Sequence, residues 1–174
     1  QAGDQPERLL VGHASSTLFE LLGINPVMGR GFARDEVGPG APRLAVLSHR
    51  FWRDRLGAPA DVVGTVQVLD GVSFTVVGVL PDGVHIRSAS AFSGPTPPHA
   101  LWVPIGSTGR ELSWGNHHYE AVGRLRPGVS LEQARSETAA LLSARSRPGV
   151  RGARLAFRKD ETTSQRLTAG HNGR

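Results

Sequence analysis

The sequence predicts an α+β fold built from short strands and helices. The segment from Arg43 to Gly83 carries, in succession, the patterns of a strand, a helix and a β-hairpin. The chain also contains 22 glycines and 12 prolines, which suit many short elements joined by tight turns. At 174 residues, 39% hydrophobic and 20% charged, it is long enough for one good core or two small lobes. We therefore expect a folded globular protein.

The first half of that segment predicts a strand followed by a capped helix. Leu44 to Leu47 is a short apolar run, and Ser48 can accept a hydrogen bond from the first helical turn. A helix is predicted from His49 to Leu56, ending at Gly57, which suits a left-handed cap. Its apolar stripe contains Phe51, Trp52 and Leu56, which are expected in the core.

The second half predicts a β-hairpin. Two β-branched runs, Thr65 to Leu69 and Ser73 to Leu80, are separated at Asp70-Gly71. This dipeptide readily adopts the positive φ angles of a two-residue hairpin turn. Pro81-Asp82-Gly83 then ends the second strand.

Weaker signals lie on both sides of this unit. Upstream, a strand is expected to end at Leu9 to Val11, and Ser15 or Ser16 can cap a helix that runs through Leu22. Downstream, residues 87–99 are rich in Ser and Pro and predict an irregular excursion.

The last third of the chain predicts two further strands and a helix. A strand is expected from His117 to Leu125, and Pro127-Gly128 forms the turn that follows it. Ser130 and Gln133 have the spacing of a capping box, so a helix should begin there. A final strand is predicted from Ala153 to Arg158.

Several kinds of chemistry have no support in the sequence. The absence of cysteine excludes disulfides, thiol catalysis and zinc-thiolate sites. No phosphate-binding loop of the G-x-x-x-x-G-K-[ST] type occurs, so this chain is not expected to be an ATPase. No apolar run reaches the roughly 18 residues of a membrane helix. The start at Gln1 suggests a piece of a longer protein.

Candidate catalytic and metal-binding groups are sparse. His118 and Glu120 would share a face of their strand, but no third metal ligand accompanies them. Ser48 precedes His49 without the nucleophile elbow of a hydrolase. The carboxylate pairs at 35–36 and 160–161 lie in loops, with nothing to separate their pKa values for acid and base roles. We expect no enzyme activity, no metal and no cofactor.

The C-terminal segment is strongly basic in a chain of formal net charge +5. Such a face could contact an acidic ligand, nucleic acid or anionic lipid, although a solvated surface is the simpler interpretation. Only Phe157 is available for stacking on bases, so no specific nucleic acid is expected. A free-standing binding module that uses this face is the alternative function. The residues of the basic face are Arg145, Arg147, Arg151, Arg154, Arg158 and Lys159.

The order of these motifs resembles a known family. VLSHRFWRDRLG, then VVG, then VQVLDGVSFTVVGVLP is similar to the MacB-like periplasmic core domain of ABC-transporter permeases, in the FtsX-like or duplicated orphan permease group. ASSTLFELLGINPVMGR upstream, and LWVPI and VGRLRPGVSLEQA downstream, extend the resemblance from Val11 to Leu142. The match is poor from Val84 to Ala100.

The resemblance implies an architecture. A porter-like lobe, residues 1–39 and 114–174, would be interrupted by an inserted, sabre-like lobe of residues 40–113. It also implies a location on the periplasmic side of the bacterial cytoplasmic membrane. The parent permease would supply the flanking transmembrane helices.

The resemblance further implies a non-catalytic role. A separate ATP-binding subunit or domain would drive the membrane helices, and the lobes would couple that motion to substrate export or partner engagement in the periplasm. Some relatives work with a periplasmic adaptor protein. Because inserted loops often carry recognition, we expect partner or substrate contacts at Phe92, Pro97 and Pro98.

Overall fold

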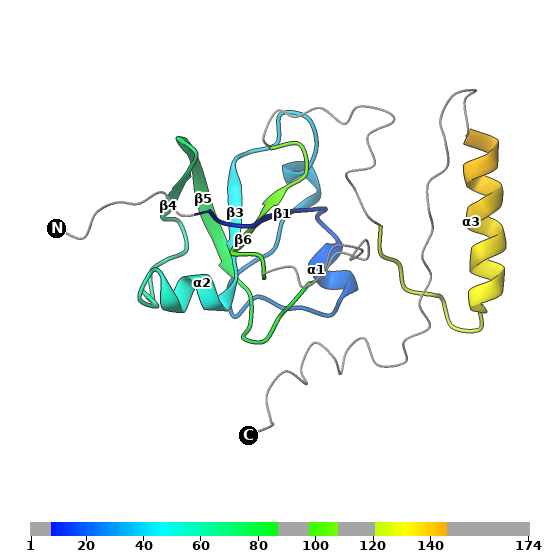
Figure 1. Cartoon of the computed structure of the whole chain (residues 1–174), viewed down its shortest axis with the longest axis horizontal. Helices are drawn as coiled ribbons and strands as arrows, with labels where there is room; N and C mark the ends of the chain where they lie inside the picture. The colour runs from blue at the N-terminus through cyan, green and yellow to red at the C-terminus, as the bar shows by residue number, and fades with distance from the viewer. Residues whose placement is uncertain (1–7, 87–97, 108–120, 146–174) are drawn as a thin grey trace, which may run out of the picture.

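The computed structural model describes residues 8–86, 98–107 and 121–145, and these contain a mixed β-sheet with few helices (Figure 1). This agrees with the predicted α+β class. The strands are β1 (Val11–Ala14), β2 (Met28–Gly29), β3 (Leu44–Leu47), β4 (Val66–Leu69), β5 (Val72–Val79) and β6 (Leu101–Pro104). The helices are α1 (Leu18–Leu21), the 3-10 helix η1 (Arg34–Glu36), α2 (His49–Asp54) and α3 (Leu131–Arg145).

The strand order is β1-β6-β3-β5-β2, and β4 also pairs with β5. The β1–β6 and β3–β5 pairs are parallel, and the others are antiparallel. Along one edge of β5, its first half pairs with β4 and its end with β2, while β3 occupies the other edge. The outer edge of β4 has no partner strand among the described residues.

Both faces of the sheet are covered by apolar side chains. In β3, Ala45 and Leu47 lie in one cluster and Val46 in the other, as the alternation of a strand requires. In β6, Leu101 and Val103 face the first cluster and Trp102 the second. Phe51, Trp52 and Leu56 pack on the first cluster, whereas Phe19, Ile24 and Phe32 belong to the second. Coverage of both faces explains why β3 and β6 are continuous apolar runs.

The predicted unit from Arg43 to Gly83 is confirmed. The Ser48 hydroxyl accepts from the Phe51 N–H at 3.2 Å, which caps α2. The helix ends at Asp54, two residues before the predicted end at Leu56. Gly57 then has φ 76°, the predicted left-handed conformation.

The hairpin turn is also confirmed. Asp70 and Gly71 have φ 49° and 77°, and the flanking Leu69 and Val72 face each other. Two positive φ angles in a two-residue loop define the type I′ turn, whose twist matches that of the strands.

Two predictions near the N-terminus are wrong in detail. β1 begins at Val11, where the predicted strand should end, because its parallel partner β6 fixes the paired residues as Val11 to Ala14. The N-cap of α1 is Thr17, which makes no side-chain capping bond, so neither Ser15 nor Ser16 is the cap. The Ser15 hydroxyl lies 3.4 Å from that of Thr17 instead.

The segment from 121 to 145, here called the arm, differs from the sheet. Residues 121–125 are not a strand, contrary to the prediction, since no described strand lies beside them to share hydrogen bonds; residues 117–120 lie outside the described residues. Arg124 donates to the carbonyl of Leu21 at 2.7 Å. The capping box is confirmed by bonds of 3.1 Å and 2.9 Å between Ser130 and Gln133. Figure 1 shows α3 to one side of the sheet.

The predicted lobe boundary at residue 39 crosses one continuous sheet. β1 and β2 precede this boundary, yet they pair with β6 and β5 beyond it. The division into 1–39 with 114–174 and 40–113 stays a prediction. The final strand predicted at 153–158 lies outside the described residues. No helix in the described part of the chain is long and apolar enough to cross a membrane.

Candidate functional site

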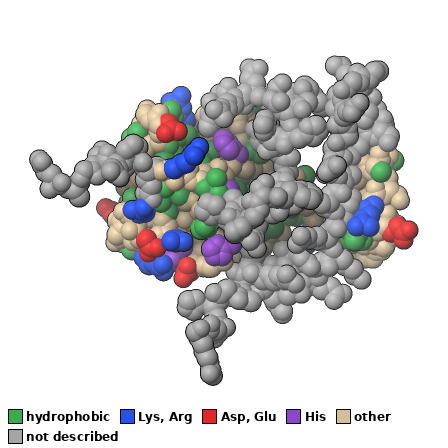
Figure 2. All heavy atoms as spheres, in the orientation of Figure 1, with side chains coloured by type: hydrophobic (Ala, Val, Ile, Leu, Met, Phe, Trp, Pro, Cys, Tyr) green, Lys and Arg blue, Asp and Glu red, His purple; other side chains and the backbone are tan. Residues whose placement is uncertain are grey.

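The predicted contact residues are described only at one position. Pro98 is exposed at the start of the segment 98–107, whereas Phe92 and Pro97 lie outside the described residues. Arg145 ends α3, and the rest of the predicted basic face, from Arg147 to Lys159, lies outside them. On the face that Figure 2 shows, acidic and basic side chains of the described residues are interspersed. The contact surface and the basic face both stay predictions.

The residues at the two ends of the 87–97 excursion meet the core at one buried cluster. Val84 and Ile86 pack against the cluster that contains Trp102. On the returning side, the His99 ring lies 4.4 Å from the Trp102 ring, centroid to centroid. The chain therefore leaves and re-enters the body at the same buried cluster, and it re-enters against Trp102, which is 7% exposed.

Burial lowers the pKa of His99, while a hydrogen bond with the backbone of Ile86 acts in the opposite direction. A histidine with a lowered pKa favours the packed state when it is neutral. Its contribution to stability is present above the ordinary value of 6.5 and falls as the pH drops through the lowered value. Acid should therefore loosen the anchoring of the excursion.

Trp102 is in turn fixed by its neighbours. Its ring makes an edge contact with Phe19, with centroids 6.2 Å apart. Gly12 on β1 lies against the same ring, and a Cβ at this position would collide with the indole. The anchor therefore depends on residues from β1, α1 and β6.

A second polar cluster joins α2 to the turn after β5. His49 Nδ1 lies 3.6 Å from Asp82 Oδ1, and Arg53 Nη1 lies 3.9 Å from Asp82 Oδ2. Buried His49 Nδ1 makes no hydrogen bond. The adjacent Ser48 hydroxyl accepts from the Phe51 N–H as the helix cap. This geometry holds the turn after β5 against α2.

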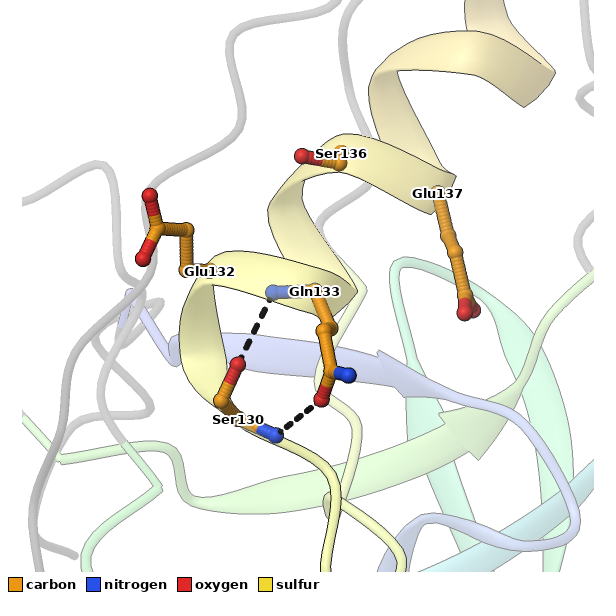
Figure 3. Close-up of a pocket in the computed structure, with 5 residues that line it drawn as sticks. All are labelled: Ser130, Glu132, Gln133, Ser136 and Glu137. Carbon is orange, nitrogen blue, oxygen red and sulfur yellow. Dashed lines mark hydrogen bonds between the residues drawn. The ribbon is translucent and has the colours of Figure 1, made fainter.

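A shallow hollow lies at the start of α3 (Figure 3). Ser130 and Gln133 are bonded to each other in the capping box, and the side chains of Glu132 and Glu137 point to different sides. Ser136 completes the lining. Because its polar groups do not converge, the hollow is a weak candidate for a ligand site.

Two other candidates from the sequence are the Asp35-Glu36 pair and the pair of His118 and Glu120. Glu36 receives two hydrogen bonds of 2.6 Å from Arg30 and one of 2.8 Å from the Ala33 N–H. These bonds, chiefly those from Arg30, lower the pKa of Glu36, so the Asp35-Glu36 pair contains one carboxylate held in an ion pair. His118 and Glu120 lie outside the described residues. Within the described segments, no group of three His, Asp or Glu residues could hold a metal ion.

A family model for the MacB-like periplasmic core domain matches residues 1–141. The chain belongs to this family. The MacB-like assignment made from the motif order is therefore confirmed. No protein among the curated sequences matches the chain.

One solved structure shows the same fold, and a second is similar over a smaller part of the chain. The periplasmic region of MacB from Actinobacillus actinomycetemcomitans is similar, with a TM-score of 0.51 and 16% identity, over 75% of this chain and 53% of that one. The MacB-like domain described here thus spans about half the length of that relative. The extracellular domain of YknZ, a noncanonic ABC-type transporter from Gram-positive bacteria, has a TM-score of 0.43 and 16% identity, over 60% and 48% of the two chains.

Sequence reasoning missed two polar ties of this MacB-like domain. The sequence predicts only a loop where the Arg30–Glu36 ion pair forms. No sequence pattern indicates the hydrogen bond from Arg124 to Leu21. The spacing of Ala33 and Glu36 resembles half of a capping box, which could have indicated the first tie. The second joins residues 103 positions apart, so no local pattern could reveal it.

Proposed function

We propose that this domain couples ATP-driven movement of transmembrane helices to work outside the membrane, as part of a longer permease. The observation that carries the proposal is the family match over residues 1–141, within a family of permease periplasmic domains. ATP would be hydrolysed on a separate subunit or domain. The work would be substrate export or engagement of a partner such as a periplasmic adaptor.

The packing of the sheet supports this role. Close-packed interiors have low compressibility and transmit displacement, and this sheet is covered by buried clusters on both faces. A push on β1 would be carried through the hydrogen-bonded β6 and β3 to β5.

The proposal also assigns a role in partner or substrate contact to the 87–97 excursion. The residues at its two ends pack on one buried cluster, with His99 against Trp102, so a contact made on the excursion would be attached to the stiff body. Phe92, Pro97 and Pro98 are the proposed contacts. Their joint replacement by alanine should lower export or adaptor binding by the parent permease without changing its ATPase activity in detergent.

Distance measurements on the parent permease with its ATP-binding partner test the coupling. In a parent whose other cysteines, if any, have been replaced, the exposed Arg50→Cys position can be spin-labelled in the two copies or halves of the assembly. We expect their separation to change between ATP-bound and nucleotide-free states. A second pair within one domain, Arg43→Cys with Arg50→Cys, should keep its distance.

A hydrolysis-deficient ATP-binding partner is the control, because it should trap one of the two separations. An unchanged separation in every nucleotide state would overturn the proposed coupling. A change within the domain itself would instead mean that the body deforms.

A further inference from the structure

The free edge of β4 carries an inference that does not depend on the permease role. Among the described residues β4 pairs only with β5, so one side of the strand is open. Thr65 accepts from the Val76 N–H, which directs the amide of the next residue, Val66, away from β5. Because strand residues alternate, Val66 and Val68 turn their N–H and C=O groups to the open side, and Gln67 turns its groups to β5.

The same two residues expose their side chains. Val66 is 54% exposed and Val68 64% exposed, and Val63 nearby is 43% exposed. These are β-branched side chains, which suit packing across a strand pair. The outer edge thus offers unpaired backbone groups and an apolar row together.

The strand lacks two of the devices that normally protect an edge, namely charged residues and proline. Residues 62–69, VVGTVQVL, contain no charge and no proline. A bulge lies just before β4, where the Gly64 N–H and the Thr65 carbonyl both bond to Val76, and the register against β5 is then continuous from Val66 to Leu69. Natural edge strands commonly use charge, proline or a bulge to prevent pairing with another chain.

We propose that this edge pairs antiparallel with β4 of a second copy of the chain. A two-fold axis at Gln67 would place Val66 opposite Val68 of the partner subunit, so that both residues exchange backbone hydrogen bonds. The exposed valines of the two copies would then form one apolar patch. The occupant is a second copy because the strand is complementary to itself in this register.

Charge supports that register. The acidic residues that flank the segment are Asp61 and Asp70. Pairing about Gln67 sets Asp70, in the turn after β4, near Gly64 of the partner subunit, while Asp61 lies before the paired residues. No like charges face each other across the edge. A strand of four residues buries less than the roughly 1,200 Å² of a standard interface, so we expect a weak, reversible dimer.

Covalent capture suits such a dimer, since the chain contains no cysteine. In the proposed register Gln67 faces its own copy as a non-hydrogen-bonded pair, whose Cα atoms are about 4.5 Å apart, within disulfide range. Val68 faces Val66 of the partner subunit, and its own copy is diagonal, beyond the roughly 7 Å limit. Under mild oxidation, Gln67→Cys should therefore form dimers about fivefold faster than Val68→Cys.

Random collision predicts the opposite order, because Val68 is exposed and Gln67 is only partly so. Equal rates, or a faster Val68→Cys, would overturn the proposal. Dimers absent from both variants would overturn it too.

Two edge variants in the Gln67→Cys background test the backbone pairing and the side-chain packing of the proposed dimer. Val68→Lys adds a charge to the edge, and Val68→Pro removes an outward N–H without removing a bond to β5. Each should reduce dimer formation to the rate of Val68→Cys, at an unchanged melting temperature. If Val68→Pro unfolds the chain, Val68→Lys still decides. An unchanged rate in a folded Val68→Lys variant would refute edge pairing.

Discussion

The sheet and the arm carry local signals of equal quality but are stabilised differently. α2 begins with a capping serine and packs its aromatic stripe on a buried cluster. α3 begins with a complete capping box, yet the described side chains from Glu132 to Leu141 are exposed or only partly buried. Capping fixes where a helix starts, and burial decides how much the helix contributes to stability.

The largest expected difference between the two regions concerns leucine truncation. Leu47 in β3 is 0% exposed, and Leu141 in α3 is 64% exposed. Leu47→Ala should lower the free energy of unfolding by about 3 kcal/mol because it leaves a cavity in a packed core. Leu141→Ala should change it by less than about 0.5 kcal/mol. Urea denaturation of both variants measures this, and a similar loss in both would mean that α3 is packed as firmly as the sheet.

Glycine replacement gives a smaller and sharper contrast. A Cβ at Gly78 in β5 would collide with the carbonyl oxygen of Arg30, a backbone atom that cannot rotate away, whereas one at Gly123 in the arm meets nothing within 4 Å. Gly78→Ala should cost about 2 to 3 kcal/mol. Gly123→Ala, its matched control, should stay within about 0.5 kcal/mol. Thermal melts compare the two, and a tolerated Gly78→Ala would show that β2 and β5 can separate.

The smallest expected effect depends on pH. Arg30 lowers the pKa of Glu36, so the stability that this pair contributes is present above the ordinary value of 4.5 and is lost as the pH falls through the lowered value. Glu36→Gln should cost about 1 kcal/mol at neutral pH, since Arg30 is 54% exposed and solvent weakens the pair. The difference from the parent chain should shrink in acid.

Glu137→Gln in the arm is the matched control, because Glu137 is an exposed glutamate on α3. It should leave the stability curve nearly unchanged between neutral and acidic pH. Denaturation at several pH values measures both variants. A Glu36→Gln deficit that stays constant down to the acid limit would contradict an ionic origin.

Much of the local structure could be predicted from the sequence. The β3 strand, the Ser48 cap, the Asp70-Gly71 turn and the Ser130–Gln133 capping box all agree with expectation. Each depends on residues within about four positions of one another, so neighbouring residues in the sequence are enough to determine it. The predicted strand at 121–125 failed because a strand needs a partner, which periodicity alone does not supply.

The candidate site was harder to predict. Proline and serine content indicated the excursion at 87–99 but did not identify its anchor. Trp102 becomes the anchor because His99 and Gly12 meet there from separate parts of the chain, and Ile86 packs on the same cluster. The free edge of β4 was similarly invisible, since a β-branched run predicts a strand and does not tell which of its edges is paired.

The sequence by itself determined the unit from β3 to β5, the start of α3 and the family, because these depend on short-range chemistry and on the order of motifs. The tertiary structure decided that β1 lies beside β6, some 90 residues away, and that Arg124 reaches Leu21. It also decided which strand edge is left open. These features follow from the joint packing of two apolar clusters on one sheet, a constraint that no single segment contains.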